Sequence, residues 1–156
     1  MIIYRLAAAG DRETIRALLD AERLPSSDLA ASGVVLIAAK TRDRVVGCVG
    51  VEPHGDAGII RSLAVAPEYR RRGIARSLVS RAEALALKGG LRCLYLLTES
   101  AVDFWNKIGY VAVSRTEPPA AVRASAEFAS LCSPSATCMK RVLSEPMEDK
   151  PRGGFS

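Results

Sequence analysis

Aromatic residues are scarce in this sequence. Phe, Trp and Tyr make up 5% of its 156 residues, and there is a single Trp. Proteins that bind single-stranded nucleic acid stack bases on aromatic side chains and follow the backbone with a basic groove. The sequence shows no such aromatic platform and no long basic stripe. The net charge of +5 therefore indicates a basic face for an anionic small molecule, and we expect no nucleic-acid partner.

Long hydrophobic runs are also missing. No stretch of about 18 or more apolar residues occurs, so no segment is expected to span a membrane. Arg5 and Gly10 interrupt the N-terminus before an apolar core of useful length forms, so no secretory signal is expected. The four cysteines do not form the dense pattern of a disulfide-stapled domain. We expect a reduced, cytoplasmic protein.

The overall composition is that of one ordinary globular domain. Hydrophobic residues make up 49% and charged residues 25% of a chain whose length suits a single core. We predict one domain over residues 1–143. Residues 144–156 are rich in Pro, Gly and charge, so we expect a disordered tail there.

The hydrophobic pattern alternates between strand-like and helix-like segments. Strands are expected over residues 2–6, 34–39, 45–52, 59–65, 91–97, 110–115 and 137–143. Helices are expected over residues 12–23, 74–88, 101–108 and 120–129. Residues 53–58 are dense in turn formers and are expected to form a loop. That loop would join two strands of an antiparallel meander.

The segment from Ile59 to Lys88 is the most informative. An apolar strand is ended by Pro67, three arginines and Gly73 follow, and a helix with one apolar face begins at Ile74. The first turn of a helix has unpaired backbone N–H groups and a partial positive charge. Gly73 would let a phosphate approach the backbone closely. We interpret the turn as an anion site; an ordinary strand–helix unit with solvated arginines is the alternative.

This segment resembles motif A of the GNAT N-acetyltransferase superfamily. The family signature, Arg/Gln-x-x-Gly-x-Gly/Ala, stands here as Arg70-x-x-Gly73-x-Ala75 after Leu63-Ala64-Val65-Ala66-Pro67. The resemblance implies acetyl-coenzyme A as co-substrate, with its pyrophosphate on the turn and its thioester along the strand. The implied cofactor-binding residues are Leu63, Ala64, Val65, Arg70, Arg71, Arg72, Gly73, Ile74, Ala75, Ser77 and Phe104.

Residues 101–110 are similar to the family's motif B, Ala-x-x-Phe-Tyr-x-x-x-Gly-Phe. Trp105 stands where the family has a Tyr that often protonates the departing thiolate. An indole N–H donates a hydrogen bond but does not titrate in the useful range. Tyr110 or Tyr95 could substitute, although packing is the role expected of both. We favour the other possibility, that a thiol of pKa about 8.5 leaves as the thiolate without an acid.

The order of elements over residues 2–143 resembles the GNAT fold. The resemblance implies an α/β protein with a mixed, mostly antiparallel central sheet of six to seven strands flanked by helices. It implies a V-shaped splay between the fourth and fifth strands. It also implies direct attack of an amine on the thioester, without a covalent acyl-enzyme, and an oxyanion held by the backbone near Leu63. We expect a monomer or a homodimer.

A base must take a proton from the attacking amine. Glu52, His54 and Glu99 lie where predicted strands end, and each could accept the proton directly or through water. Glu52 is preferred because a carboxylate on a strand is held better than one in a loop. Glu52, Leu63 and Trp105 make up the predicted catalytic set.

Arg61 and Ser62 interrupt the apolar strand beside the expected thioester site. Because strand residues alternate between faces, one of the two should face the acceptor. An arginine there would bind an anionic group bidentately; a salt bridge to a neighbouring strand is the alternative. Arg61, Ser62, Thr98 and Glu99 are the predicted acceptor-binding residues.

Within the superfamily, the sequence is similar to small acetyltransferases encoded with arsenic-resistance genes, through residues 61–65, 96–99 and 131–139. This resemblance implies an amino-acid-like acceptor that carries an arsinic or phosphinic acid; a protein N-terminus or a lysine is an alternative acceptor. A catalytically silent coenzyme A binder, or a metalloid sensor using Cys132 and Cys138, is the alternative from another class. Because the cysteine spacing matches no zinc signature, we predict structural cysteines and no metal site.

Overall fold

The computed structural model describes residues 1–31, 33–42 and 44–143, so the expected disordered tail lies outside the described residues. One seven-stranded sheet, in the order β1-β2-β3-β4-β5-β7-β6, runs through the molecule. Its strands are β1 (Ile3–Leu6), β2 (Val35–Thr41), β3 (Arg44–His54), β4 (Ala57–Val65), β5 (Cys93–Thr98), β6 (Val111–Val113) and β7 (Thr137–Val142).

The sheet is mixed and mostly antiparallel, as predicted. Among the strands of the described residues only β4 and β5 pair in parallel, and their pairing ends after three residue pairs, at Ile59↔Tyr95. Beyond that point the two strands diverge, although β4 continues to Val65 and β5 to Thr98. This divergence is the predicted V-shaped splay, and it opens the middle of the sheet.

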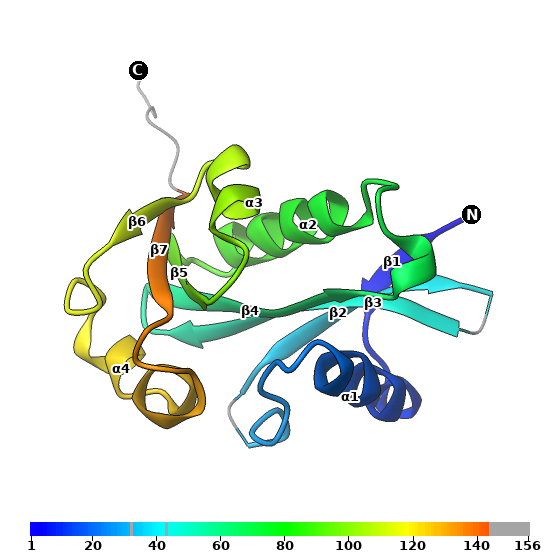
Figure 1. Cartoon of the computed structure of the whole chain (residues 1–156), viewed down its shortest axis with the longest axis horizontal. Coiled ribbons are helices and arrows are strands. Elements are labelled where there is room, and N and C mark those ends of the chain that lie inside the picture. The colour runs from blue at the N-terminus through cyan, green and yellow to red at the C-terminus, as the bar shows by residue number, and fades with distance from the viewer. Residues whose placement is uncertain (32, 43, 144–156) are drawn as a thin grey trace.

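Helices cover both faces of the sheet (Figure 1). They are α1 (Arg12–Ala21), α2 (Ile74–Lys88), α3 (Val102–Lys107) and α4 (Ala120–Arg123). α2 and α3 lie on one face, where Leu78 and Ala82 of α2 are fully buried in the larger core cluster. α1 lies on the other face and buries Ile15 and Leu19, which are four residues apart and so share one side of the helix. None of the helices in the described part of the chain has the length and apolar character that crossing a membrane requires.

Two expectations about the elements were wrong. Residues 53–58 are not an open loop, because β3 runs to His54 and β4 begins at Ala57, which leaves a two-residue hairpin turn. Gly55, at φ 69°, supplies the left-handed backbone of that turn. The helix expected over residues 120–129 is also interrupted. α4 ends at Arg123, and a separate π turn, η3 (Glu127–Leu131), follows it.

A hydrogen-bond network shapes the interruption between α4 and η3. The Ser125 hydroxyl accepts a hydrogen bond from the Phe128 N–H at 3.3 Å, a local side-chain-to-backbone contact. The Arg115 guanidinium donates to the carbonyls of Phe128 and Ser133, at 3.0 and 2.8 Å. These bonds fix the segment that carries Glu127 beside the splayed strands.

Candidate active site

Two cavities open along β4 where it diverges from β5. The acidic cavity, of about 460 Å³, is bordered by Arg61 and Ser62 of β4, by residues 96–101, and by Glu127 and Cys132. The arginine-turn cavity, of about 430 Å³, is bordered by residues 63–65 and by Arg70, Arg71 and Gly73. Both volumes are typical of ligand sites. The two cavities meet, because the same four residues line both: Glu22, Leu63, Ala101 and Phe104.

Most of the predicted cofactor-binding residues line the arginine-turn cavity. Those that do are Leu63, Ala64, Val65, Arg70, Arg71, Gly73, Ile74, Ala75 and Phe104. Arg72 instead lies over the Tyr69 ring, at 5.0 Å from its centroid. The Ser77 N–H is used inside α2, where it donates to the Gly73 carbonyl at 3.0 Å. The structure therefore places Arg72 and Ser77 outside this cavity.

The turn that borders this cavity has the backbone of an anion site. Arg71 and Gly73 have φ values of 64° and 79°, and a Cβ built on Gly73 would meet no heavy atom within 4 Å. Gly73 is also the N-cap of α2, and within the described residues no side chain caps this helix. Its first turn contains no acidic residue. The first N–H groups of α2 are thus open to an anion.

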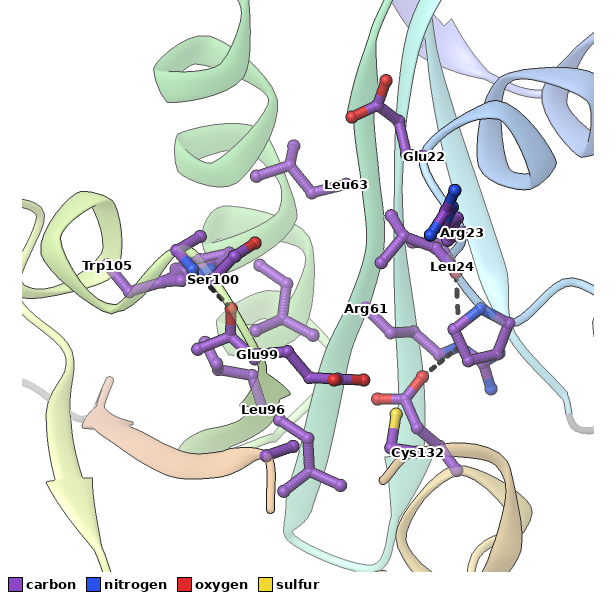
Figure 2. A pocket seen from close by; sticks show the side chains of 18 of the residues that line it. Glu22, Arg23, Leu24, Arg61, Leu63, Leu96, Glu99, Ser100, Trp105 and Cys132 are labelled. Atoms are coloured by element: carbon purple, nitrogen blue, oxygen red, sulfur yellow. Dashed lines mark hydrogen bonds and ion pairs between the residues drawn. The ribbon is translucent and has the colours of Figure 1, made fainter. Parts of the chain in front are cut away.

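Arg70 links the arginine turn to the end of α1, the helix on the other face of the sheet. Its Nε donates to the Val65 carbonyl at 3.1 Å, and its Nη2 forms an ion pair with Glu22, just past the end of α1. Glu22 lies at the boundary of the two cavities, near Leu63 in Figure 2. The pair therefore sits where the two cavities join.

A β-bulge lies at the point where the cavities meet. Val49 of β3 faces two residues of β4, Ser62 and Leu63, because the pairing shifts between Cys48 and Gly50. Ser62 has a φ of 61°, and its carbonyl accepts a hydrogen bond from the Cys48 thiol at 3.2 Å. On the β5 side, β4 has no strand partner beyond Ile59 in the described part of the chain. Backbone groups at Leu63 are thus available beside both cavities.

The floor of the acidic cavity is a buried ion-pair cluster around Arg61. The guanidinium is bidentate to Asp28 at 2.7 Å for each nitrogen–oxygen pair. It also reaches Glu52 Oε1 at 2.8 Å and Glu127 Oε1 at 3.1 Å. We name this four-residue group the Arg61 cluster. Figure 2 shows the Arg61 side chain extending from β4, the Glu99 carboxylate pointing toward it from the other side, and Cys132 lower in the view.

The anion-binding role expected of Arg61 needs correction. Its side chain is 0% exposed, and protein carboxylates occupy its donors. The salt-bridge alternative is what the structure contains. The argument from strand alternation failed because the bulge turns Ser62, so that the Arg61 Nε also donates to the Ser62 hydroxyl at 3.2 Å. Both side chains thus lie on the same side of β4.

Three carboxylates around one guanidinium cannot all ionise easily. Burial raises the pKa of Glu127 to about 7; the charge of Arg61 opposes this rise, while Glu52 and Asp28 add to it. Burial disfavours the charge on Arg61, but Asp28, Glu127 and Glu52 together raise its pKa. The cluster thus keeps a permanently charged guanidinium beside the Glu127 carboxyl group, whose pKa lies close to neutral pH.

Glu52, the preferred base, is placed differently from our expectation. It is 2% exposed, its Oε1 contacts Arg61, and its Oε2 lies 2.7 Å from His54 Nε2. Neither Glu52 nor His54 lines either cavity. Glu99 does line the acidic cavity, as does Glu127, which no sequence pattern singled out. Glu127 was missed because its segment matched a plain helix and no family motif.

Neither Tyr110 nor Tyr95, the two tyrosines considered as general acids, is placed to protonate a leaving group. The Tyr110 hydroxyl donates to Glu83 at 2.8 Å, and burial holds its pKa far above its usual value. The Tyr95 hydroxyl donates to Glu117 at 3.3 Å, and burial raises its pKa to about 12. Neither ring lines either cavity. Trp105 lines the acidic cavity and packs edge-on against Phe104 and Tyr110.

We predict that Trp105→Phe changes the turnover number by less than about tenfold. Phe keeps the edge-to-face contact with Tyr110 and loses only an N–H that does not titrate in the useful range. Loss of a general acid would lower the rate by about 100-fold or more. The measurement is steady-state kinetics of both proteins, with thermal unfolding to account for lost packing. A fall of several orders of magnitude in a folded variant would assign Trp105 a chemical role.

The cysteines form no binding cluster. Cys132 lines the acidic cavity, while Cys138 is buried in a separate cluster with Val122 and Phe128. Burial raises the pKa of Cys132 to about 12, which disfavours the thiolate needed to bind a soft metalloid. Within the described residues, no three His, Cys, Asp or Glu side chains are grouped as a metal ion requires.

Comparison with known proteins identifies relatives of this chain. A family model for the acetyltransferase (GNAT) domain matches residues 31–112. An uncharacterized N-acetyltransferase of Chlorobaculum tepidum is 33% identical over 78 residues, which cover 49% of this chain and 50% of that protein. An amino-acid acetyltransferase of Ectopseudomonas mendocina is 35% identical over 79 residues, which cover 49% of this chain and 18% of that protein. The chain thus matches about half or less of the length of these relatives.

Among solved structures, similarity extends over nearly the whole chain. N-acetylglutamate synthase from Neisseria gonorrhoeae, complexed with coenzyme A and N-acetyl-glutamate, superposes with a TM-score of 0.79 at 20% identity. The match covers 93% of this chain and 36% of that chain. At this identity the likeness establishes the fold alone.

Proposed function

The chain belongs to the GNAT acetyltransferase family, and on that premise we propose that it transfers an acetyl group from acetyl-coenzyme A to the amine of a small molecule. The observation that carries the proposal is the meeting of the two cavities at Leu63. One cavity has the open helix terminus and arginines that suit a pyrophosphate. The other has carboxylates that suit a protonated amine.

The residues present fit coenzyme A at the arginine-turn cavity. The N–H groups of Ile74 and Ala75, with Arg70 and Arg71, would hold the pyrophosphate. The unpaired edge of β4 would hold the chain that leads to the thioester, because it presents backbone donors and acceptors next to Leu63. Acetyl-coenzyme A, when bound there, would supply the acetyl group as a thioester. The pyrophosphate would compete with Glu22 for Arg70.

Transfer by direct attack then needs three conditions. The amine must be neutral, it must lie next to the carbonyl carbon, and the developing oxyanion must meet a donor. The acidic cavity would hold the amine, and the backbone N–H at the Leu63 bulge would face the oxyanion. The carbon–sulfur bond then breaks with its electron pair on sulfur. A thiol of pKa about 8.5 is a tolerable leaving group without an acid.

We propose an amino-acid-like acceptor that carries an anionic group. Arg23 lines the acidic cavity on the side opposite Trp105, and within the described residues no hydrogen bond or ion pair engages its side chain. It is thus the cation available to an acceptor carboxylate, arsinate or phosphinate, in place of the occupied Arg61. An acceptor ammonium would face Glu99 and Glu127. The names of the relatives, amino-acid acetyltransferase and N-acetylglutamate synthase, agree with this class of acceptor.

The test is release of free coenzyme A thiol from acetyl-coenzyme A with a panel of amines. The panel holds amino acids, their arsinic and phosphinic analogues, matched amines without an anionic group, and peptides with a free N-terminus or lysine. We expect the lowest KM with the first two sets and slower but measurable turnover of the matched plain amines. Arg23→Ala should raise KM about tenfold for anionic acceptors, because it removes a charge-assisted hydrogen bond of about 1.5 kcal/mol, and leave KM for the plain amines unchanged.

Arg16→Ala is the matched control for Arg23. Arg16 is an exposed arginine of α1 that lines neither cavity, so its loss should change neither KM. Equal effects of Arg23→Ala on all acceptors would contradict the assignment of the anion site. Tight coenzyme A binding without turnover of any amine would instead favour a catalytically silent coenzyme A binder.

A further inference from the structure

Glu127 is the one carboxylate that belongs both to the Arg61 cluster and to the lining of the acidic cavity. Asp28 and Glu52 contact Arg61 but line neither cavity, and Glu99 lines the cavity but is exposed. Glu127 itself is 4% exposed, so its carboxyl group is almost completely shielded from bulk solvent. We infer that Glu127 is the general base that takes the proton from the acceptor amine, an assignment that rests on the proposed function.

The backbone around Glu127 is unusual in a way that suits this role. Glu127 begins the π turn η3, in which the Cys132 N–H donates to the Glu127 carbonyl at 3.1 Å. Single π turns occur frequently at functional sites. The Ser125 hydroxyl and the Arg115 guanidinium fix this turn through their bonds to Phe128. The side chain is therefore held at one place, as a base must be.

Charged groups from every neighbouring element set the proton affinity of Glu127. Arg61 of β4 stabilises its carboxylate, whereas Glu52 of β3 and Asp28, which precedes β2, disfavour it. Cys132 and Glu99 complete the polar surroundings on the cavity side. Because burial dominates, the pKa of Glu127 is raised to about 7. A base of this pKa is partly ionised at neutral pH and still accepts a proton readily.

The protons balance in this scheme. The acceptor enters as an ammonium ion and gives one proton to a Glu127 carboxylate oxygen. The neutral nitrogen then bonds to the thioester carbon, and the carbon–sulfur bond breaks with its electron pair on sulfur. The second nitrogen-bound proton passes to the thiolate or to water. Glu127 returns its proton to solvent through the open cavity before the next turnover.

The experiment compares Glu127→Gln with the wild type and with Glu117→Gln across a range from about pH 5 to about pH 9. Gln keeps the shape of the side chain but cannot take the proton. We expect kcat/KM of the wild type to rise with pH through about 7, where Glu127 ionises. In Glu127→Gln we expect kcat to fall about 100-fold or more, that rise to disappear, and coenzyme A affinity to stay unchanged. Glu117 pairs with Lys140 and lines neither cavity, so Glu117→Gln should behave as wild type.

A second acceptor separates proton transfer from mere positioning. An aminooxy analogue is already neutral at pH 7, so it needs no base, and with it the loss in Glu127→Gln should shrink to less than about tenfold. An equal loss with both acceptors, or a pH profile that Glu127→Gln does not change, would overturn the assignment while leaving acetyl transfer intact. A wild-type protein that binds coenzyme A and acetylates no amine would overturn the proposed function itself.

Discussion

Coenzyme A binding is expected to fall at least about 100-fold in Gly73→Glu. Gly73 has a φ of 79°, which strains any side chain with a Cβ, and the space in front of it is open. A Glu side chain would therefore extend from the N-cap of α2 into the space assigned to the pyrophosphate. Juxtaposed like charges cost several kcal/mol, and about 2.7 kcal/mol corresponds to 100-fold. Isothermal titration with coenzyme A measures the change.

Gly90→Glu is a matched control for this variant. Gly90 also has a positive φ, of 91°, and a Cβ there would also meet no heavy atom within 4 Å. It lies beyond the other end of α2 and lines neither cavity. The same backbone strain and the same added charge should therefore leave coenzyme A affinity unchanged. Equal affinity of Gly73→Glu and Gly90→Glu would mean that the pyrophosphate binds somewhere else.

The arginine turn could be predicted because its determinants are contiguous. Pro67, the three arginines, Gly73 and the apolar face of α2 follow one another within 30 residues of sequence. Each of these residues restricts the backbone conformation of its neighbours in the sequence, so the local pattern determines the local structure. The splay of β4 and β5 came from the resemblance to a family, and the pairing of the two strands confirms it.

The predicted acceptor-binding residues Arg61, Ser62, Thr98 and Glu99 do line the acidic cavity. The Arg61 cluster at its floor could not be predicted, because its members come from distant segments. Arg61 lies 33 residues from Asp28 in the sequence and contacts Glu127 on a different element. No local sequence pattern predicts that three carboxylates will contact one guanidinium. The bulge at Ser62 is a second reason, since it breaks the regular alternation of side chains that predicted which face of the sheet Arg61 occupies. Residues assigned by alternation are thus least secure where a strand bulges.

Removing the cation of the Arg61 cluster should destabilise the fold strongly. Arg61→Met keeps much of the volume but leaves Asp28, Glu52 and Glu127 without their shared partner. Breaking a buried ion pair in this way costs about 3–5 kcal/mol. Denaturant unfolding at pH 7 measures the loss. Arg44→Met is the control, because Arg44 pairs with Glu68 at the exposed surface and its removal should hardly move the midpoint.

The loss of folding stability in Arg61→Met should also depend on pH, and proton linkage gives the direction of this dependence. Burial already raises the pKa of Glu127 above its unfolded value, and removing the opposing charge of Arg61 should raise it further. A group with a raised folded-state pKa contributes stability below its unfolded pKa and loses it as pH rises through the folded value. Arg61→Met should therefore be closest to wild type near about pH 5 and furthest from it near about pH 8. A deficit that stays constant over this range would mean that lost packing, and not unpaired charge, is what Arg61 prevents. Because the same charges set the proton affinity of Glu127, a constant deficit would also weaken its assignment as the base.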